Sequence, residues 1–570
     1  MPKRKVSPEE LDEILIEKNI EDNLWYKDAV FYELHVRTFF DSNGDGVGDF
    51  KGLTSKLDYI QSLGVDCIWL LPFFPSPLRD DGYDVSDFYN VHPDIGTLED
   101  FKQFTEEAHN RGLRVISDMV FNHVSNDHEW FQQARSDPNN PKRDWFVWAD
   151  DDKKYKDVRI IFTDTETSNW TWDPVAKQYF WHRFFRNQPD LNYDNPEVRN
   201  EIKNVISYWM DLGLDGMRCD AVPYLFEREG TSGENLPETH EFFKDVRRMM
   251  DEKYPGKILL AEANQLPDET IPYFGTNEEN EFHMAFNFPL MPRIFIALAR
   301  KDRSAIVDIL EQTKNIPKKA QWATFLRNHD ELTLEMVTDE ERDLMYLEYA
   351  KHPKMRINLG IRRRLAPLVD NDRLTMEMLT AMLLTFPGSP VIYYGDELGM
   401  GDNLFLGDRN GVRTPMQWSS DLNAGFSIAD PEHCYLPPIT NPAYHYETLN
   451  IRTEEKMPYS FLNWVKARLS VRRKTKAFGR GTFEILEPEN KKIFAFIREY
   501  KDDTVLCIYN LSRRPQYCEL DLSRYKGLYL FELNGEVQFP KITDDKNVFT
   551  MTGHRFFWFH ISKEEIESEF

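Results

Sequence analysis

The sequence has few cysteines and no long hydrophobic run, and these absences exclude several classes of protein. Its five cysteines are scattered over 570 residues, with no Cys-x-x-Cys or other metal-type spacing. We therefore expect a reduced, cytoplasmic protein without a disulfide framework. No apolar run reaches the roughly 18 residues that a membrane span requires, so no membrane partner is expected. The stretch 1–19 has basic residues but no apolar core, and we do not expect it to be a signal peptide.

Positive charge is also scarce. Lys and Arg total 70 against 96 Asp and Glu, which gives a formal net charge of −26. Nucleic acid is therefore not an expected partner, because its phosphates require a basic face. We interpret the acidic surface as serving solubility. The sequence leaves open whether several copies of the chain associate into a homo-oligomer.

What the sequence does contain is a regular alternation of strand-like and helix-like segments. Leu53, Leu57, Ile60 and Leu63 form an apolar stripe at helical spacing between two of the strand-like runs. Eight such runs alternating with helices predict an α/β fold, a (β/α)8 TIM barrel. The runs cover residues 29–36, 65–74, 113–122, 216–222, 258–264, 282–288, 323–328 and 389–397.

Three segments interrupt or follow the barrel, which we assign to residues 1–122 and 195–477. Residues 123–194 are rich in Trp, Asp and Asn, and we expect them to form an inserted subdomain over the barrel mouth. Residues from about 331 to 372 are expected to form a charged helical insertion. Residues 478–570 change to short alternating strands, which predicts a separate antiparallel β domain. That domain either stabilises the barrel or binds carbohydrate.

Ionisable residues end three of the runs. Asp220 ends GMRCDAV, Glu262 ends ILLAEAN, and His329 and Asp330 end ATFLRNHD. Because the C-terminal ends of barrel strands meet at one face, these groups should converge. Arg218 lies two residues before Asp220 and would keep it ionised, as a nucleophile requires. An apolar setting would raise the pKa of Glu262 and favour a general acid. Each residue alone is more often structural, but together they indicate chemistry at a sugar acetal.

Five motifs resemble the signature regions of the α-amylase family, in order. DMVFNH (118–123), GMRCDAV, AEAN (261–264) and RNHD (327–330) resemble its four main regions, and QPDLN (188–192) resembles a fifth. The resemblance covers almost the whole chain. It implies that Asp220 is the nucleophile, Glu262 the acid/base and Asp330 the transition-state stabiliser, with the first two carboxyls about 5–5.5 Å apart. The further substrate-binding residues that it implies are His123, Gln188, Arg218 and His329.

The segment SPLRDDGYD (76–84) follows the second run and carries further candidate substrate ligands. Asp80 and Tyr83 resemble the pair that grips a terminal glucose in this family. Arg413, in GVRTPMQW (411–418), resembles the arginine that pairs with this aspartate. A buried Asp–Arg pair closing the pocket would admit one non-reducing glucose and favour disaccharide-sized substrates. A purely structural salt bridge is the alternative interpretation.

The loop DSNGDGVGD (41–49) spaces oxygen ligands at alternate positions. Its twelfth position is Gly52 and not Glu, which excludes an EF-hand. The loop resembles the single-loop calcium site of the oligosaccharide-acting branch of the family, and an Asx-rich turn is the alternative. The ligands implied are Asp41, Asn43, Asp45, Asp49 and the carbonyl of Val47.

A second cation site is implied by resemblance to the calcium site that ties the inserted subdomain to the barrel. Its ligands would be Asn122, Asp190 and Glu227, with the carbonyls of Tyr224 and Leu225. All are oxygens, as a hard cation prefers. We therefore expect Ca²⁺ at one or two sites, with Mg²⁺ as the alternative ion.

The flanking sequences resemble one branch of the family, whose members isomerise maltose to trehalose. The segments that carry this resemblance are 71–88, 220–244 and 261–265. It implies a disaccharide substrate, a covalent glucosyl-enzyme and minor hydrolysis to glucose. An exo-α-glucosidase is the main alternative. A non-catalytic binding or transporter-associated subunit is a further one, although the complete set of three acidic residues argues against it.

Overall fold

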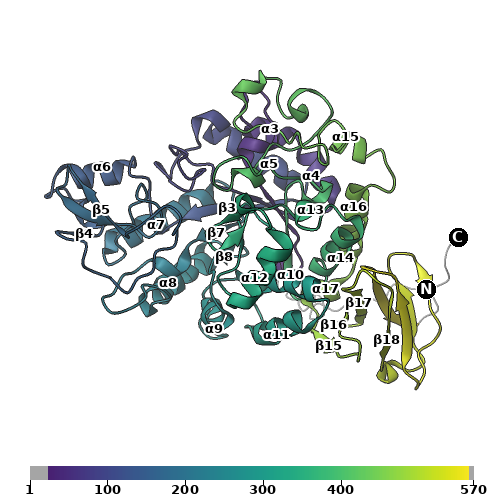
Figure 1. The fold of residues 1–570 in the computed structure, drawn as a ribbon. Helices are drawn as coiled ribbons and strands as arrows, with labels where there is room; N and C mark the ends of the chain where they lie inside the picture. Colours follow the sequence, from purple (N-terminus) through teal and green to yellow (C-terminus); the bar gives the residue numbers. More distant parts are fainter. Residues whose placement is uncertain (1–22, 564–570) are drawn as a thin grey trace, which may run out of the picture.

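The computed structural model describes residues 23–563 and centres on a closed barrel of eight parallel strands (Figure 1). All eight predicted runs contribute a barrel strand, so the predicted fold class is confirmed. The N-terminal stretch 1–19 lies outside the described residues. In spatial order the strands are β1 (Phe31–Leu34), β14 (Ser389–Tyr393), β10 (Gln321–Phe325), β9 (Met284–Phe286), β8 (Ile258–Ala261), β7 (Gly216–Asp220), β3 (Arg114–Val120) and β2 (Cys67–Leu70).

The register of three neighbouring strands aligns the polar residues at their C-terminal ends. Between β3 and β7, Asp118 lies opposite Arg218 and Val120 opposite Asp220. Between β7 and β8, Cys219 lies opposite Ala261, so Glu262 follows at the level of Asp220. The strands therefore deliver two acidic groups and one guanidinium to the same level of the barrel.

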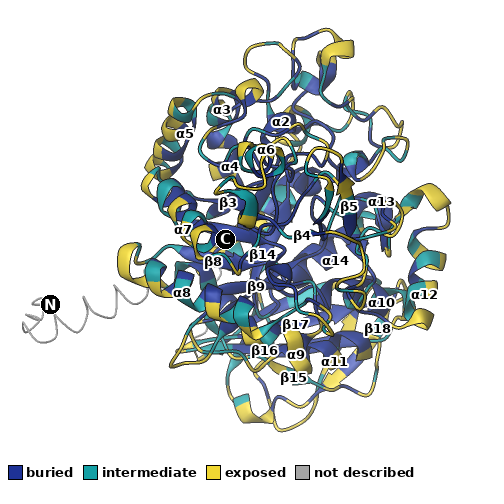
Figure 2. Ribbon diagram, turned by 90° about the vertical axis from the view of Figure 1, so that its left-hand side faces the viewer, coloured by how far each residue is buried: buried dark blue, intermediate teal, exposed yellow. Residues whose placement is uncertain are grey.

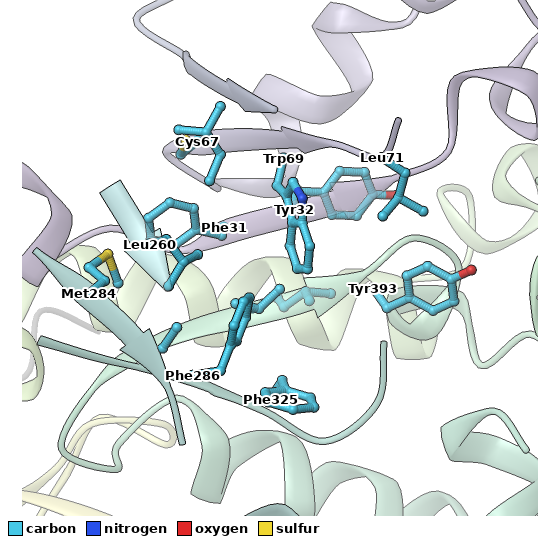
Figure 3. Packing of buried hydrophobic residues seen from close by; sticks show 14 of the residues in the cluster. Phe31, Tyr32, Cys67, Trp69, Leu71, Leu260, Met284, Phe286, Phe325 and Tyr393 are labelled. Carbon is cyan, nitrogen blue, oxygen red and sulfur yellow. The ribbon is translucent and has the colours of Figure 1, made fainter. Parts of the chain in front are cut away.

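Aromatic and aliphatic side chains fill the barrel interior (Figure 3). The ring of Phe286 lies 5.3 Å from that of Trp69 and 5.6 Å from that of Phe325. All three side chains are buried. The barrel is thus a packed core and not a channel, and it presents a low-dielectric floor to whatever lies at its C-terminal end.

Two of the outer helices begin at recognisable caps. Thr97 and Asp100 form a capping box at α5 (Leu98–Asn110), and Asn195 caps α7 (Pro196–Asp211), which has Pro196 in its first turn. The predicted leucine stripe is buried but spans two helices, α3 (Phe50–Ser55) and α4 (Leu57–Leu63). The other barrel helices are α2 (Val36–Phe39), α8 (Pro237–Lys253), α9 (Pro267–Thr270), α10 (Leu290–Arg300), α11 (Ser304–Thr313), α14 (Arg373–Leu383), α15 (Ile451–Glu454), α16 (Phe461–Lys474) and α17 (Lys476–Arg480).

Two insertions lengthen the loops after β3 and β10. The first contains α6 (Glu129–Ser136) and a three-stranded antiparallel sheet of β4 (Trp148–Ala149), β6 (Gln178–Trp181) and β5 (Trp170–Asp173). The second contains α12 (Asp339–Tyr349) and α13 (Leu365–Leu368), together with a small sheet of β11 (Leu332–Thr333), β13 (Gly360–Ile361) and β12 (Arg356–Ile357).

The second insertion, predicted to be helical, thus contains both helices and three short strands. Its hairpin turns through Asn358, whose φ of 46° lies in the left-handed region that Asn tolerates. Gly360 in β13 lies so close to β11 that a Cβ on it would come within 2.9 Å of the Leu332 carbonyl oxygen. These local requirements favour a hairpin over a continuous helix.

The chain ends in an antiparallel β domain at the opposite end of the molecule from the first insertion (Figure 1). Its strands build a core of their own around Ile493, Leu506 and Phe559. Figure 2 shows the buried centre of the barrel within a more exposed outer layer of helices. No helix among residues 23–563 is long and apolar enough to cross a membrane. The strands of this domain are β15 (Glu484–Leu486), β16 (Ile493–Tyr500), β17 (Asp503–Asn510), β18 (Gln516–Leu520), β19 (Tyr529–Glu532), β20 (Val537–Gln538), β21 (Asn547–Met551) and β22 (Phe556–Ser562).

Candidate active site

A cavity of about 130 Å³ lies at the C-terminal ends of the barrel strands. Barrel residues form its floor, and both insertions contribute to its walls. Phe162 and Phe184 reach it from the first insertion, and Glu331 and Glu335 from the second. The predicted residues that line it are Asp80, Tyr83, His123, Asp220, Tyr224, Glu262 and Asp330.

Arg218 joins the two carboxyl groups predicted to act on substrate. Its Nη1 lies 2.6 Å from Asp220 Oδ1, and its Nη2 lies 2.6 Å from Glu262 Oε1. The guanidinium is buried and does not line the cavity, so it acts from beneath the two acids. Glu262 Oε2 also accepts a hydrogen bond from the Ala221 backbone N–H at 3.1 Å. Both acids are therefore oriented before any substrate arrives.

Burial and charge give the two acids different proton affinities. The pKa of Glu262 is raised to about 7, chiefly by burial. Arg218 lowers this pKa in part, and the negative charges of Asp220 and Asp330 raise it further. Burial also raises the pKa of Asp220, against the attraction of Arg218. Glu262 is thus able to carry a proton near neutral pH, as a general acid must.

The third acid, Asp330, lies in a cluster of cations. Its Oδ1 accepts hydrogen bonds from Arg409 Nη1 at 3.0 Å and Arg413 Nη2 at 2.9 Å, and its Oδ2 lies 3.1 Å from His329 Nε2. Burial would raise its pKa, but His329 and Arg409 outweigh burial and hold that pKa well below its usual value. Asp330 therefore stays ionised and faces the cavity as a fixed negative charge.

His329 is held between a ring and a carboxylate. It stacks on Tyr83 with an interplanar angle of 11°, its Nε2 lies 2.7 Å from Tyr83 Oη, and its Nδ1 lies 2.5 Å from Glu33 Oε1. Burial lowers its pKa, but Asp330 and Glu33 overcome this and raise it to about 10. His329 is therefore positively charged at neutral pH, although Tyr83 and not His329 lines the cavity.

The predicted pairing of Arg413 with Asp80 is wrong. Arg409 Nη2 donates to Asp80 Oδ1 at 2.9 Å, whereas Arg413 Nη1 donates to Asp81 Oδ2 at 2.9 Å. The two arginines flank a single helical turn, so both point toward the same acidic segment. Arg409 lines the cavity and Arg413 does not. The residue that closes the pocket over Asp80 is therefore Arg409.

Two further predicted substrate residues lie around Asp80 and Tyr83. Gln188 is fully buried, does not line the cavity, and donates its Nε2 to Asp80 Oδ2 at 2.8 Å. His123 lines the cavity with its Nε2 3.2 Å from the Tyr83 carbonyl oxygen, and burial lowers its pKa to about 3. Gln188 is thus placed to orient Asp80, and His123 faces the cavity as a neutral ring.

Sequence reasoning missed several residues of the site. Asp118 opens the motif DMVFNH, yet its role appears only in the structure, where its Oδ1 lies 2.5 Å from Arg218 Nη1 and its Oδ2 accepts from Trp69 Nε1 at 3.1 Å. Phe162 lies beneath the Arg409 guanidinium, 5.5 Å from its carbon. Nothing in the local sequence of either insertion marks Phe162 or Glu335 as facing a cavity.

Contacts between the two insertions lie beside the cavity, which Glu335 lines. Arg159 of the first insertion donates Nη1 to Glu335 Oε2 of the second at 3.1 Å. Its Nε also donates to Glu234 Oε1 at 2.8 Å, in the loop after β7. Farther along, Asp164 Oδ2 accepts from the Asn358 backbone N–H at 2.9 Å. We call these four residues of the two insertions, Arg159, Glu335, Asp164 and Asn358, the latch.

The residues of the second predicted cation site lie where the first insertion meets the barrel. Asn122 Oδ1 and Asp190 Oδ2 are both buried without a hydrogen-bond partner among the described residues, and Glu227 is buried as well. The chain is held here by the Leu191 N–H, which donates to the Asn122 carbonyl at 2.9 Å. Two oxygens without donors in a buried place fit a hard cation. This fit does not test the prediction of calcium.

In the loop 41–49 the predicted ligands accept hydrogen bonds from the loop itself. Asp41 accepts from the backbone N–H of Asn43, Gly44 and Gly46, and Asp49 caps α3 through the Gly52 N–H at 2.7 Å. Within residues 23–563, no three His, Cys, Asp or Glu side chains converge as a metal cluster. The calcium loop therefore stays a prediction beside the Asx-turn alternative.

A closed parallel barrel with three carboxyl groups at its C-terminal face, two of them sharing one guanidinium, defines an enzyme that acts on glycosidic bonds. The model of the alpha amylase catalytic domain matches residues 33–359 and 361–481, and that of the maltogenic amylase C-terminal domain matches residues 483–558. The chain therefore belongs to the α-amylase family.

The similar proteins include trehalose synthases and solved structures of a trehalulose synthase and an isomaltulose synthase. A trehalose synthase/amylase TreS of Mycobacterium tuberculosis is 55% identical over 550 residues, covering 96% of this chain and 92% of that protein. The trehalose synthase of Thermus thermophilus is 56% identical over 546 residues, which are 95% of this chain and 56% of that protein. The crystal structure of the trehalulose synthase MutB from Pseudomonas mesoacidophila MX-45 is similar with a TM-score of 0.75 and 27% identity, covering 94% of this chain and 99% of that one. The isomaltulose synthase PalI from Klebsiella sp. LX3 gives a TM-score of 0.76 at 26% identity, with coverage of 94% and 99%.

Proposed function

We propose that this protein interconverts maltose and trehalose by intramolecular transglucosylation, with minor hydrolysis to glucose. The similarity to trehalose synthases over almost the whole chain supports this function. The observation that carries it is the cavity in which Asp220 and Glu262 share Arg218, next to two insertions that the latch joins. Such a cavity suits a reaction in which one half of the substrate is released and used again.

In the first step Asp220 attacks C1 of the non-reducing glucose of maltose. The bond from C1 to O4 breaks as the Asp220 oxygen bonds to C1, and Glu262 gives its proton to the departing O4. This leaves a glucosyl ester on Asp220, an ionised Glu262 and a free glucose in the cavity. The proton-carrying state of Glu262 near pH 7 supports its role as the acid.

In the second step the free glucose turns and presents its anomeric hydroxyl to C1. The Glu262 carboxylate takes the hydroxyl proton as the oxygen attacks C1, and the ester bond to Asp220 breaks. The products are trehalose, an ionised Asp220 and a protonated Glu262, so the enzyme returns to its starting state. Two displacements at C1 preserve its α configuration.

The remaining cavity residues hold the glucosyl unit. Asp80, oriented by Gln188 and Arg409, binds the outer hydroxyls, and the Tyr83 ring packs against the sugar. Asp330 stays ionised and binds sugar hydroxyls more strongly as C1 gains positive charge. His329 keeps Tyr83 and Asp330 in place.

Water is the competitor for the glucosyl ester, because hydrolysis needs no other residues. A glucose held beside C1 has a very high effective concentration, so isomerisation wins as long as water is excluded. The latch supports this exclusion because it joins the two insertions above the cavity. An exo-α-glucosidase, the second candidate function, would use the same acids with an open cavity.

The test is to incubate the purified protein with maltose and follow the sugars by proton NMR. We expect trehalose as the main product, with a small amount of glucose. Trehalose offered as substrate should give maltose in the same final proportion. Glucose as the main product would overturn the isomerase and leave an α-glucosidase.

We also propose that Ca²⁺ binds between Asn122, Asp190 and Glu227, and that the loop 41–49 is a second candidate site. The two buried oxygens without donors support the first. Calcium should raise the melting temperature of the wild-type protein above its value in EDTA. Asp190→Asn should abolish this increment, and Asp49→Ala should reduce it if the loop also binds; Mg²⁺ serves as the comparison ion. An identical melting temperature with Ca²⁺ and with EDTA would contradict the proposal.

A reduced, cytoplasmic location is the last part of the proposal. The five cysteines are all free, and four of them are buried. Titration of denatured protein, prepared without reductant, should therefore count five thiols per chain. Fewer than five would indicate oxidation and contradict it.

A further inference from the structure

A second, smaller cavity lies behind Asp330, between the barrel and its outer helices. Its volume is about 20 Å³, and a water molecule needs roughly 10–15 Å³. Arg327 lines it from the end of β10, and Asp396 and Glu397 line it from the segment after β14. Apolar side chains of α14 and α16, such as Leu383 and Val465, complete its wall. The cavity thus fits one small molecule between a guanidinium and two carboxyl groups.

Arg327 is buried and connects this cavity to the active site. Its Nη2 donates to the backbone carbonyl oxygen of Asp330, and its Nε donates to the carbonyl oxygen of Arg363 at 2.6 Å. Arg363 lies in the second insertion, between β13 and α13. A single guanidinium therefore fixes the backbone of Asp330 and ties it to the second insertion, which lines the active site.

Two polar atoms of residues that line the small cavity have no hydrogen-bond partner in the described part of the chain. Arg327 Nη1 and Glu397 Oε2 are buried and have no hydrogen-bond partner among the described residues. The other Glu397 oxygen, Oε1, is satisfied by the hydroxyls of Tyr32 and Tyr59, each at 2.7 Å. An unsatisfied buried group costs about 1–3 kcal/mol, and more when it is charged. A donor and an acceptor that face one water-sized cavity call for a molecule that can accept from one and donate to the other.

From this geometry we propose that Arg327 is a positioning residue for Asp330, anchored by a buried water molecule that it shares with Asp396 and Glu397. The water accepts from Arg327 Nη1 and donates to the carboxyl oxygens. The guanidinium is then held on one side by this water and aims its Nη2 at the Asp330 carbonyl on the other. The proposal rests on Asp330 having the role given under the proposed function.

Different arginines therefore hold different parts of Asp330. Arg409 and Arg413 hold its carboxylate, whereas Arg327 holds its backbone. The carboxylate reaches its full effect only when C1 becomes positive, so a small displacement of the backbone weakens the transition state more than the bound substrate. Loss of Arg327 should therefore lower kcat and leave KM nearly unchanged.

The kinetic test compares Arg327→Lys with Arg472→Lys. Arg472 is a matched control, because it is also buried and donates to two backbone carbonyl oxygens, those of Leu384 and Gly388, away from the active site. Competent sites are counted by trapping the glucosyl ester with a slow fluorinated glucosyl fluoride. Turnover per counted site is then measured with 4-nitrophenyl α-glucoside and with maltose. The aryl glucoside reports on the three acids alone, so the comparison stands even if the wild-type protein makes glucose and not trehalose.

We expect Arg327→Lys to lower kcat per counted site about tenfold or more, a change of about 1.4 kcal/mol, with KM within about twofold of wild type. Arg472→Lys should lower the melting temperature and leave kcat per counted site unchanged. A wild-type kcat per counted site in Arg327→Lys would overturn the positioning role. It would also be overturned if Arg327→Lys lost only competent sites, or if Arg472→Lys lost as much kcat per counted site as Arg327→Lys.

The water is tested on the wild-type protein, which avoids any failure of a variant to fold. A crystal structure at high resolution should show one solvent molecule within hydrogen-bond distance of Arg327 Nη1 and of Asp396 or Glu397. Direct contact of Arg327 Nη1 with either carboxylate, or a cavity without solvent density, would overturn the shared water.

Discussion

The two reacting acids are chemically similar, and their surroundings make them different. Both contact Arg218, yet Glu262 also feels the charges of Asp220 and Asp330, and burial raises its pKa to about 7. Arg218 Nη1 contacts both Asp220 and Asp118. Burial raises the pKa of both acids and Arg218 opposes it at both, while the charges of Asp220 and Asp330 raise the pKa of Glu262 further.

This difference predicts how Glu262→Gln behaves. The amide has nearly the shape of the acid but gives no proton, so turnover of maltose should fall by about 10²–10⁴-fold. Fluoride needs no proton to leave. With α-glucosyl fluoride the variant should therefore release a burst of fluoride equal to the enzyme concentration and then stop, because no base activates the acceptor. A fluoride electrode measures the burst.

Asp220→Ala is the matching control, since it lacks the nucleophile and should give no burst. Thermal unfolding of both variants should show that the fold is intact. A fluoride burst from Asp220→Ala would contradict Asp220 as the nucleophile. Unchanged maltose turnover in Glu262→Gln would contradict Glu262 as the general acid.

The pH dependence follows from the same pair. Glu262 must be protonated to release glucose, and its raised pKa of about 7 means that this form is lost as pH rises through that value. For maltose, kcat/KM should therefore fall above about pH 7. With α-glucosyl fluoride the first step should keep its rate there, since Asp220 stays ionised. A fall in both substrates at the same pH would point to another group.

At the scale of secondary-structure elements, the barrel could be predicted from sequence and parts of the site could not. Each barrel strand is a continuous buried run, which composition reveals, and its last residue marks the functional face. The partners of Asp80 and Asp81 were not predictable, because Arg409 and Arg413 flank the same short helical turn and either could reach either acid. The strands of the second insertion are two residues long, too short for any periodicity.

The contact between the two insertions leads to a prediction for the ratio of trehalose to glucose. Arg159→Ala removes the contact with Glu335 and opens the roof of the cavity without touching the three acids. More glucose should then form from maltose relative to trehalose, by several-fold, while total consumption of maltose stays within about threefold. Proton NMR of the products gives both quantities.

Arg452→Ala is the control, because Arg452 forms an exposed ion pair with Asp421 at 2.9 Å and does not line the cavity. Exposed pairs of this kind contribute about 0–1 kcal/mol, so Arg452→Ala should lose little stability. An unchanged product ratio in Arg159→Ala would show that the latch does not exclude water.

For the molecule as a whole, a buried arginine joins the C-terminal β domain to the barrel. Arg498 of β16 donates Nη1 to the Thr385 carbonyl oxygen at 2.6 Å, just after α14, and Nε to the Thr482 carbonyl oxygen at 2.9 Å. It has no carboxylate partner among the described residues, and burial lowers its pKa to about 9. Its charge faces the C-terminal end of α14, where a cation is favourable.

This joint predicts that the domain supports the stability of the barrel and not the chemistry. Arg498→Met keeps most of the side-chain volume and leaves buried carbonyl oxygens without donors, a cost of about 1–3 kcal/mol for each. The melting temperature should fall by several degrees, whereas kcat and the ratio of trehalose to glucose should match wild type at temperatures where both proteins are folded. Calorimetry and product analysis on the same samples test this. A changed product ratio at full folding would mean that the β domain reaches the active site, through α14 and the strand β14 that follows it.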